Sequence, residues 1–347
     1  MWRCIYGVYL AGFGVLSLEI GARVLLEDVD APERVLDQAL PRLLNSAVIG
    51  GTDTPLGVQL SPNLERTVQW GRLSFQVRTN SLGFRGREPQ ARAPGEHRIL
   101  FLGDSMVYGH GLEEDETLPR RVEELAQDAS AMVATFNGAI SGMNTVQELA
   151  AAQRLLPVLT PDQVILGYFV GNDPLANLFT DVDEHGDVSF REPDVAQLRS
   201  RLDDHLRPLL ASVAFRSIAL RYYVPRLRYV WSDQQKVLDR SVELLLRTGR
   251  ACEQGGARFA VLIIYPRDGV AGGVESMLSG SRSTGRILAT RLRDAGMRVL
   301  DSSDYWNGEH ADEKFYFPED GHLNAEGAQA LAALVMDHLV LGESLSR

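Results

Sequence analysis

The chain has few cysteines and none of the common metal-binding motifs. Its 347 residues include only Cys4 and Cys252, and because Cys4 lies in an apolar stretch we expect no structural disulfide between them. No Cys-x-x-Cys pair, His-Glu-x-x-His sequence or acidic calcium-binding loop is present, so we expect no metal and no cofactor. An excess of positive charge is also absent. The formal net charge is −11, which argues against non-specific binding to nucleic acid.

The most informative feature that the chain does contain is a short apolar run that leads directly into Gly103-Asp104-Ser105. Residues 99–102 form the near-continuous apolar segment that is typical of a buried parallel strand. Gly103 permits a sharp turn, which places Ser105 at the carboxyl end of the strand, where ligands bind in open α/β sheets. A serine at that place can act as a nucleophile if a base reaches it. Without the preceding strand, the tripeptide would be ordinary turn composition.

The best candidate for the base is His322. Most of the seven histidines lie in polar, loop-like or helical surroundings, where a solvated or capping imidazole is expected. His322 instead precedes an apolar helical pattern that Asn324 can cap, and two carboxylates, Glu319 and Asp320, come shortly before it. A serine nucleophile requires an imidazole that takes its proton and a carboxylate that fixes the imidazole tautomer. The segment around His322 offers both.

Two further strand ends provide candidate donors for a developing oxyanion. Residues 132–142 are typical of a second strand followed by a glycine turn, and residues 145–148 (Thr-Val-Gln-Glu) have capping-box spacing for the next helix. A glycine such as Gly142, just before a helix, exposes its N–H. Residues 163–170 indicate a third buried strand, and Asn172 follows it. An asparagine at that end of a strand can aim its amide into the same crevice.

Together, these four segments resemble the four sequence blocks of the SGNH hydrolase family, the GDSL esterase superfamily, over about residues 97–341. The resemblance implies that Ser105 is the nucleophile and His322 the base. It also implies that the oxyanion hole consists of Ser105, Gly142 and Asn172. The fold expected from it is α/β, a flavodoxin-like three-layer α/β/α arrangement with a central parallel sheet. The expected activity is that of a serine esterase or acyltransferase.

The chain departs from the family pattern in two blocks. The third block is usually Gly-x-Asn-Asp, whereas here Gly171 directly precedes Asn172. The last block is usually Asp-x-x-His, whereas here Asp320 stands two residues before His322 and Glu319 stands three before it. The Asp-x-His spacing resembles that of some membrane-associated relatives that act on polysaccharide acyl groups. We therefore prefer Asp320 as the acid of a Ser-His-Asp triad and keep Glu319 as the alternative.

The N-terminus contains an apolar segment long enough to cross a bilayer. Ile5 to Leu26 spans 22 residues, with Arg3 before it and the acidic pair Glu27 and Asp28 after it. This charge distribution favours an internal N-terminus with the bulk of the chain outside. We expect residues 1–26 to form a transmembrane signal-anchor helix, which would hold the protein on the extracytoplasmic side of a bacterial inner membrane. A cleaved signal peptide and a buried core helix are the alternatives.

The rest of the chain divides into a linker region and a catalytic domain. We expect residues 27–97 to form a proline-rich linker and a small β appendage, with a hairpin near 68–79 and Arg85 stabilising a turn. The catalytic domain is expected over 98–341, interrupted by an arginine-bearing helical insertion at about 174–232. These arginines could face anionic lipid or an acidic glycan, or could pair with nearby carboxylates. Helices are expected near 118–128, 146–155, 234–253, 283–295 and 325–339, with further strands at 258–265 and 297–300.

These observations predict an esterase that removes O-acyl groups, with O-acetyl preferred, from an envelope or exported glycan or a similar metabolite. The expected partners are an acylated glycan or small-molecule substrate and, through the N-terminal helix, the membrane. Nucleic acid is not expected. An O-acyltransferase that uses the same triad is the first alternative, because both reactions pass through an acyl-enzyme. A non-catalytic, anchored glycan-binding or scaffold protein on the same fold is the second.

Overall fold

The computed structural model describes residues 49–50, 59–177, 180–183, 187–190, 234–270, 280–306, 311–318 and 321–341. The predicted signal-anchor helix, most of the predicted insertion, and the two candidate acids Glu319 and Asp320 lie outside these residues. Within the described part of the chain, no helix is both long and apolar enough to cross a membrane.

The core is a five-stranded parallel sheet in the order β11-β10-β7-β5-β6. The three central strands are buried along nearly their whole length, as expected where helices cover both faces of a sheet. Neighbouring strands pair with Leu102 opposite Leu166, and Leu262 opposite Gly167. The strands are β5 (His97–Gly103), β6 (Val133–Asn137), β7 (Gln163–Phe169), β10 (Arg258–Ile264) and β11 (Arg298–Asp301).

The strand order creates a switch point between β5 and β7. The chain runs from β5 to the edge strand β6 and then crosses back over β5 to β7, so the direction in which the strands are added to the sheet reverses beside β5. In open α/β sheets, ligands bind at such a point, outside the carboxyl ends of the strands. The predicted flavodoxin-like parallel sheet is confirmed, and its crevice lies where β5 and β7 end.

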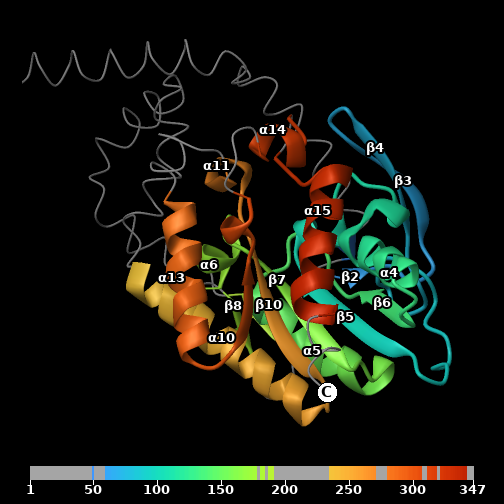
Figure 1. The fold of residues 1–347 in the computed structure, drawn as a ribbon, viewed down its shortest axis with the longest axis horizontal. Coiled ribbons are helices and arrows are strands. Elements are labelled where there is room, and N and C mark those ends of the chain that lie inside the picture. Colours follow the sequence, from blue (N-terminus) through green and yellow to red (C-terminus); the bar gives the residue numbers. More distant parts are fainter. Residues whose placement is uncertain are drawn as a thin grey trace, which may run out of the picture. The chain divides into compact units, whose positions relative to one another are not determined.

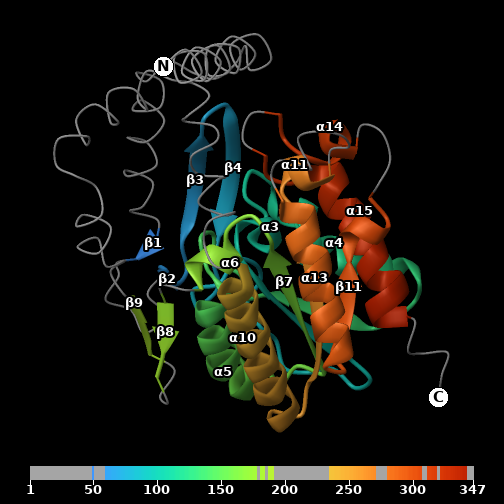
Figure 2. The same cartoon turned by 90° about the vertical axis from the view of Figure 1, so that its left-hand side faces the viewer.

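Helices cover both faces of the sheet and complete the predicted three layers (Figures 1 and 2). Helices α4 and α15 pack against each other on one face, whereas α5, α10 and α13 lie on the other. In α4 the buried residues Leu118, Val122 and Ala126 recur every four positions, which gives the helix one apolar face. The bounds are α4 (Leu118–Asp128), α5 (Thr145–Leu159), α10 (Gln234–Gln254), α13 (Ser281–Asp294) and α15 (Ala325–Val335), which continues into a π-helical turn, η3 (Met336–Val340).

The start of α5 corrects one prediction. The capping box is formed by Asn144 and Gln147, one residue earlier than the expected pair Thr145 and Glu148. The Asn144 side chain accepts hydrogen bonds from the N–H groups of Val146 and Gln147, at 3.1 and 3.3 Å. Both pairs, Asn144 with Gln147 and Thr145 with Glu148, have the spacing of a capping box, and asparagine is a stronger N-cap than threonine. In the observed frame Glu148 turns into the protein and is fully buried.

The predicted hairpin is also confirmed. Strands β3 (Glu65–Trp70) and β4 (Leu73–Arg78) pair antiparallel, with Val68 opposite Phe75, and both of these side chains are buried. The remaining short pieces are β1 (Ile49–Gly50), β2 (Gln59–Leu60), α3 (Ser105–Tyr108), η1 (Glu114–Glu116), α6 (Asp173–Ala176), β8 (Thr180–Val182), β9 (Val188–Phe190), α11 (Arg267–Val270), η2 (Ser302–Asp304) and α14 (Ala311–Phe315).

Candidate active site

Ser105 lies in a tight turn between β5 and the short helix α3. The turn requires glycine at Gly103, where φ is +154° and an added Cβ would lie 2.5 Å from Cγ2 of Val107. Asp104 caps α3, because its Oδ1 accepts a hydrogen bond from the Met106 N–H at 2.9 Å. Ser105 is the first residue of α3 and its relative exposure is 8%. The strand and the cap therefore fix the serine at the carboxyl end of a central strand.

His322 reaches the serine from the opposite end of the sequence. Its Nε2 lies 2.9 Å from Oγ of Ser105. The His322 loop is held on both sides, because the Phe317 N–H donates to the His322 carbonyl at 2.7 Å and Asn324 caps α15 through the Gly327 N–H at 2.9 Å. The structure thus brings the proposed nucleophile and the proposed base into hydrogen-bonding distance. The candidate acids are outside the described residues, so the choice of Asp320 over Glu319 stays a prediction.

Asn172 follows β7, the neighbour of β5 at the switch point. Its Nδ2 donates a hydrogen bond to Oδ2 of Asp104 at 3.0 Å. An amide nitrogen carries two hydrogens, so this bond leaves a second N–H for another acceptor. Oδ2 of Asp104 also lies 3.5 Å from Oγ of Ser105. Asp104 is therefore a direct link between the predicted oxyanion donor and the residue that carries the nucleophile.

Gly142 lies in the turn between β6 and α5. Its φ is +89°, and no atom lies within 4 Å of the place where a Cβ would be. The Met143 N–H donates to the Ile140 carbonyl at 3.1 Å, which closes the turn around it. Because β6 is the other neighbour of β5, the turn is at the same edge of the sheet as Ser105 and Asn172. Gly142 is exposed at this edge, and its part in an oxyanion hole stays a prediction.

Three fully buried acids lie behind these groups: Asp104, Glu148 on α5, and Asp173 at the start of α6. Burial raises the pKa of Asp104 from 3.8 to about 6, although its hydrogen bond from Met106 and the charge of His322 act in the opposite direction. Burial also raises the pKa of Glu148 well above its usual range, and the charge of Asp104 raises it further. The pKa of Asp173 is raised in the same way, first by burial and then by the other two acids.

His110 is the residue that the sequence interpretation missed. It follows α3, its relative exposure is only 7%, and its ring lies beside that of His322 with a centroid distance of 4.6 Å. Nδ1 of His110 is 3.5 Å from Oγ of Ser141, the residue before Gly142. The local signal was the sequence Gly109-His110-Gly111 directly after the nucleophile helix. That signal did not distinguish a loop histidine in solvent from one folded back into the site.

Arg85 is a structural residue of the loop that carries His110. It is 1% exposed, and one of its guanidinium nitrogens donates to the carbonyls of Tyr108 and Gly109 at 3.1 and 2.6 Å. The other donates to the carbonyls of Gln76, at 3.0 Å, and Leu112. Burial lowers the pKa of Arg85. This position agrees with the expected turn-stabilising role.

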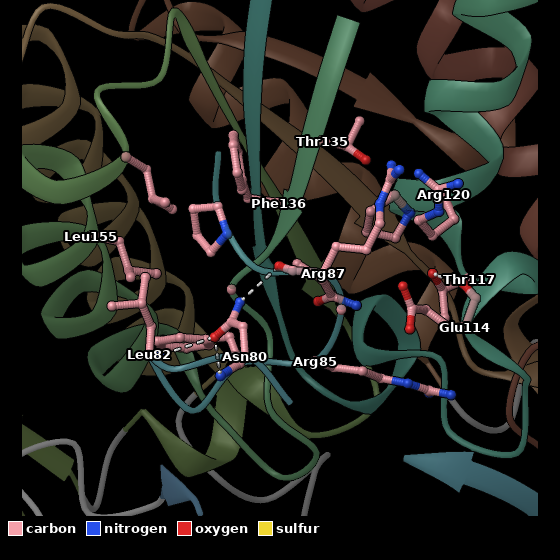
Figure 3. Close-up of a pocket in the computed structure, with 17 residues that line it drawn as sticks. Asn80, Leu82, Arg85, Arg87, Glu114, Thr117, Arg120, Thr135, Phe136 and Leu155 are labelled. Carbon is pink, nitrogen blue, oxygen red and sulfur yellow. Dashed lines mark hydrogen bonds between the residues drawn. The ribbon is translucent and has the colours of Figure 1, made fainter. Parts of the chain in front are cut away.

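A small cavity of about 30 Å³ is lined in part by Arg85 (Figure 3). Its lining includes Asn80, Arg87, Arg120 and Thr135, and none of the predicted site residues. Among the described residues, no group of three or more histidine, cysteine, aspartate or glutamate side chains is arranged to hold a metal ion.

No family model matches the chain, and no curated protein sequence matches it. Some solved structures show partial similarity to the chain. The psychrotrophic esterase EstA from Pseudoalteromonas sp. is 14% identical with a TM-score of 0.39, over 72% of this chain and 100% of that chain. The lipase/acylhydrolase from Enterococcus faecalis is 12% identical with a TM-score of 0.41, over 71% and 96%. The acetyl xylan esterase AlAXEase is 11% identical with a TM-score of 0.41, over 70% and 99%.

Proposed function

We propose that the protein is a serine esterase of the SGNH type that hydrolyses O-acyl esters. The observation that carries this proposal is the 2.9 Å contact between Nε2 of His322 and Oγ of Ser105 at the switch point of the sheet. The contact also argues against the non-catalytic scaffold, for which no hydrogen-bonded nucleophile and base is needed.

In the proposed reaction, Oγ of Ser105 attacks the ester carbonyl while His322 takes the serine proton. The oxyanion of the tetrahedral intermediate accepts hydrogen bonds from the N–H groups of Ser105 and Gly142 and from the Asn172 amide, and a donor of this kind contributes about 10²–10³ in rate. The C–O bond then breaks, and the alcohol leaves with the proton that His322 returns. Water, activated by the same imidazole, hydrolyses the acyl-enzyme.

Asp320 is the proposed partner of His322 in this cycle. A carboxylate bound to Nδ1–H would keep Nε2 unprotonated toward Ser105 and would stabilise the imidazolium that forms. Gly321, between Asp320 and His322, has a φ of +77°, a conformation that lets the chain fold sharply before the histidine. Such a turn supports the shorter Asp320 over Glu319.

Replacing Ser105 with alanine tests the proposal. We expect Ser105→Ala to abolish hydrolysis of p-nitrophenyl acetate and covalent labelling by an organophosphonate, because both reactions need Oγ. The matched control is Ser283→Ala, which removes an exposed serine on α13 whose hydroxyl donates to the Gly280 carbonyl at the start of the same helix. Equal activity of Ser105→Ala and the wild type would reject the assignment.

The proposed substrate is an O-acetylated glycan or related metabolite outside the cell membrane. The Asp-x-His spacing of the last block and the predicted anchor at residues 1–26 support this choice, and cell fractionation tests the location. Acetate release from acetylated xylan, compared with release from a simple acetate ester, tests the substrate class. If a glycan acceptor instead becomes acylated faster than free acid appears, the protein is an acyltransferase.

A further inference from the structure

We infer that His110 is a positioning residue for His322, whose ring holds the imidazole of His322 with Nε2 directed at Ser105. The inference rests on the proposed function, because it assigns a role within the proposed catalytic pair. The contact between the two rings does not depend on which carboxylate completes the triad.

The first observation is the packing of the two imidazoles. Their centroids are 4.6 Å apart and their planes differ by 33°, so the two rings are in contact in a tilted arrangement. The terminal torsion of histidine has broad, roughly two-fold preferences, so a ring held only at its edge can still swing. A second ring on its face removes that freedom. Since His110 is almost fully buried, its ring is held in place and can limit the movement of the His322 ring.

The second observation is that the β3–β4 hairpin holds the ring of His110. Trp70 lies edge-on to it with a centroid distance of 4.4 Å, and Phe75 lies edge-on at 5.3 Å. Both are edge-to-face arrangements, which are the favourable ones for aromatic rings. The hairpin therefore fixes His110, and His110 in turn lies against His322.

The third observation is that the backbone of the His110 loop is anchored. The His110 N–H donates to the Ser105 carbonyl at 3.0 Å, and Arg85 binds the carbonyls of Tyr108, Gly109 and Leu112. A Cβ on Gly111 would lie 2.9 Å from both Leu73 of the hairpin and Phe317 of the His322 loop. Helix α3 with Ser105, the β3–β4 hairpin and the loop that carries His322 thus meet at the segment around His110.

Kinetics of two substitutions separate packing from chemistry at His110. A misplacement of about 1 Å in a catalytic group costs about 10²-fold in rate. We expect His110→Ala to lower kcat on p-nitrophenyl acetate by about 10–100-fold and to change KM less than about threefold. The reason is that His322 loses the ring packed against it, while the residues that would bind the substrate are unchanged. His110→Phe keeps an aromatic face and should retain kcat within about fivefold of the wild type.

The matched control is His338→Ala. His338 also stacks on an aromatic ring, that of Tyr305, with a centroid distance of 4.8 Å and an interplanar angle of 39°, but it lies at the end of the C-terminal helix. We expect its loss to leave kcat unchanged. Each variant is first shown to be folded at the assay temperature, so that kinetics are compared only on folded protein.

The decisive measurement is a double-mutant cycle with His322→Ala. If His110 acts through His322, its removal costs nothing once His322 is gone, and the double variant keeps the residual rate of His322→Ala. An equal loss in both backgrounds would mean a merely structural role and would overturn the inference. So would wild-type kcat in His110→Ala, or a His110→Phe variant as slow as His110→Ala. A fully active Ser105→Ala variant would instead reject the proposed function itself.

Discussion

At the scale of single residues, the reactivity proposed for Ser105 depends on groups that approach it from distant parts of the sequence. His322 provides the base, and Asp104 provides a buried carboxylate whose Oδ2 lies 3.5 Å from the serine Oγ. The same Oδ2 orients the Asn172 amide through a 3.0 Å hydrogen bond. Asp104 therefore positions one predicted oxyanion donor and places negative charge near the imidazolium that forms during the reaction.

Two single substitutions can identify which carboxylate, Asp320 or Glu319, is the acid partner of His322. We expect Asp320→Asn to lower kcat by orders of magnitude, by analogy with the cost of a wrong histidine tautomer, and Glu319→Gln to change it little. The two substitutions are matched, since each replaces a carboxylate by its amide within three residues of His322. Steady-state kinetics on p-nitrophenyl acetate make the comparison. The reverse pattern would move the acid to Glu319.

Single residues also show what sequence reasoning could reach. Ser105 and His322 were identifiable because each belongs to a local pattern, a strand followed by a glycine turn and a loop before a capped helix. His110 was not, because the side chains that bury it, Trp70 and Phe75, lie 40 and 35 residues away in the sequence. Contacts of that kind arise only from the way the hairpin packs on the main sheet domain.

At the scale of elements, Arg85 connects the hairpin region to the nucleophile loop. We expect Arg85→Lys to lower the free energy of unfolding by about 2–4 kcal/mol, because lysine cannot reproduce a fork that binds four backbone carbonyls and would leave some of them buried and unpaired. Arg87→Lys is the control two residues along. Its side chain is 61% exposed and pairs with Glu123, so a change below about 1 kcal/mol is expected.

Urea denaturation of the two arginine variants and the wild type provides the measurement. Comparable stability losses at Arg85 and Arg87 would mean that the carbonyl contacts of Arg85 do not hold the loop. The two arginines are two positions apart in the sequence, and only the structure distinguishes them, since one guanidinium is enclosed and the other is on the surface.

The elements of the sheet domain were largely predictable, because buried parallel strands are continuous apolar runs and its helices show apolar periodicity. The error at the start of α5 has a different origin. Two overlapping capping boxes fit the same five residues, and contacts from elsewhere favour one of them. The Thr145 N–H donates to Oδ1 of Asn177 at 3.0 Å, and the Asn177 amide donates to the Thr145 hydroxyl at 3.1 Å. A partner 32 residues away thus holds Thr145 inside the helix.

At the scale of the whole molecule, the cluster of Asp104, Glu148 and Asp173 ties global stability to pH. Each acid binds its proton more tightly in the folded state than in the unfolded chain, because burial raises its pKa. Between the ordinary and the raised pKa the folded state holds more protons, so the free energy of unfolding falls as pH rises. For Asp104 this window runs from 3.8 to about 6, and Glu148 and Asp173 extend it to higher pH.

Replacing Glu148 with glutamine tests this linkage, because the amide cannot ionise. We expect Glu148→Gln to reduce the loss of unfolding free energy between about pH 5 and pH 8, whatever its effect on absolute stability. Glu253→Gln, an exposed glutamate on α10, should leave that loss unchanged. The pKa of His97 is lowered by burial and acts with the opposite sign, but its contribution cancels when variant and wild type are compared at each pH. Denaturant titrations at several pH values give the slope of the unfolding free energy against pH.

If this slope is the same for Glu148→Gln and for the wild type, Glu148 does not hold its proton more tightly in the folded protein. The carboxyl cluster at the strand ends would then not be the source of the pH dependence.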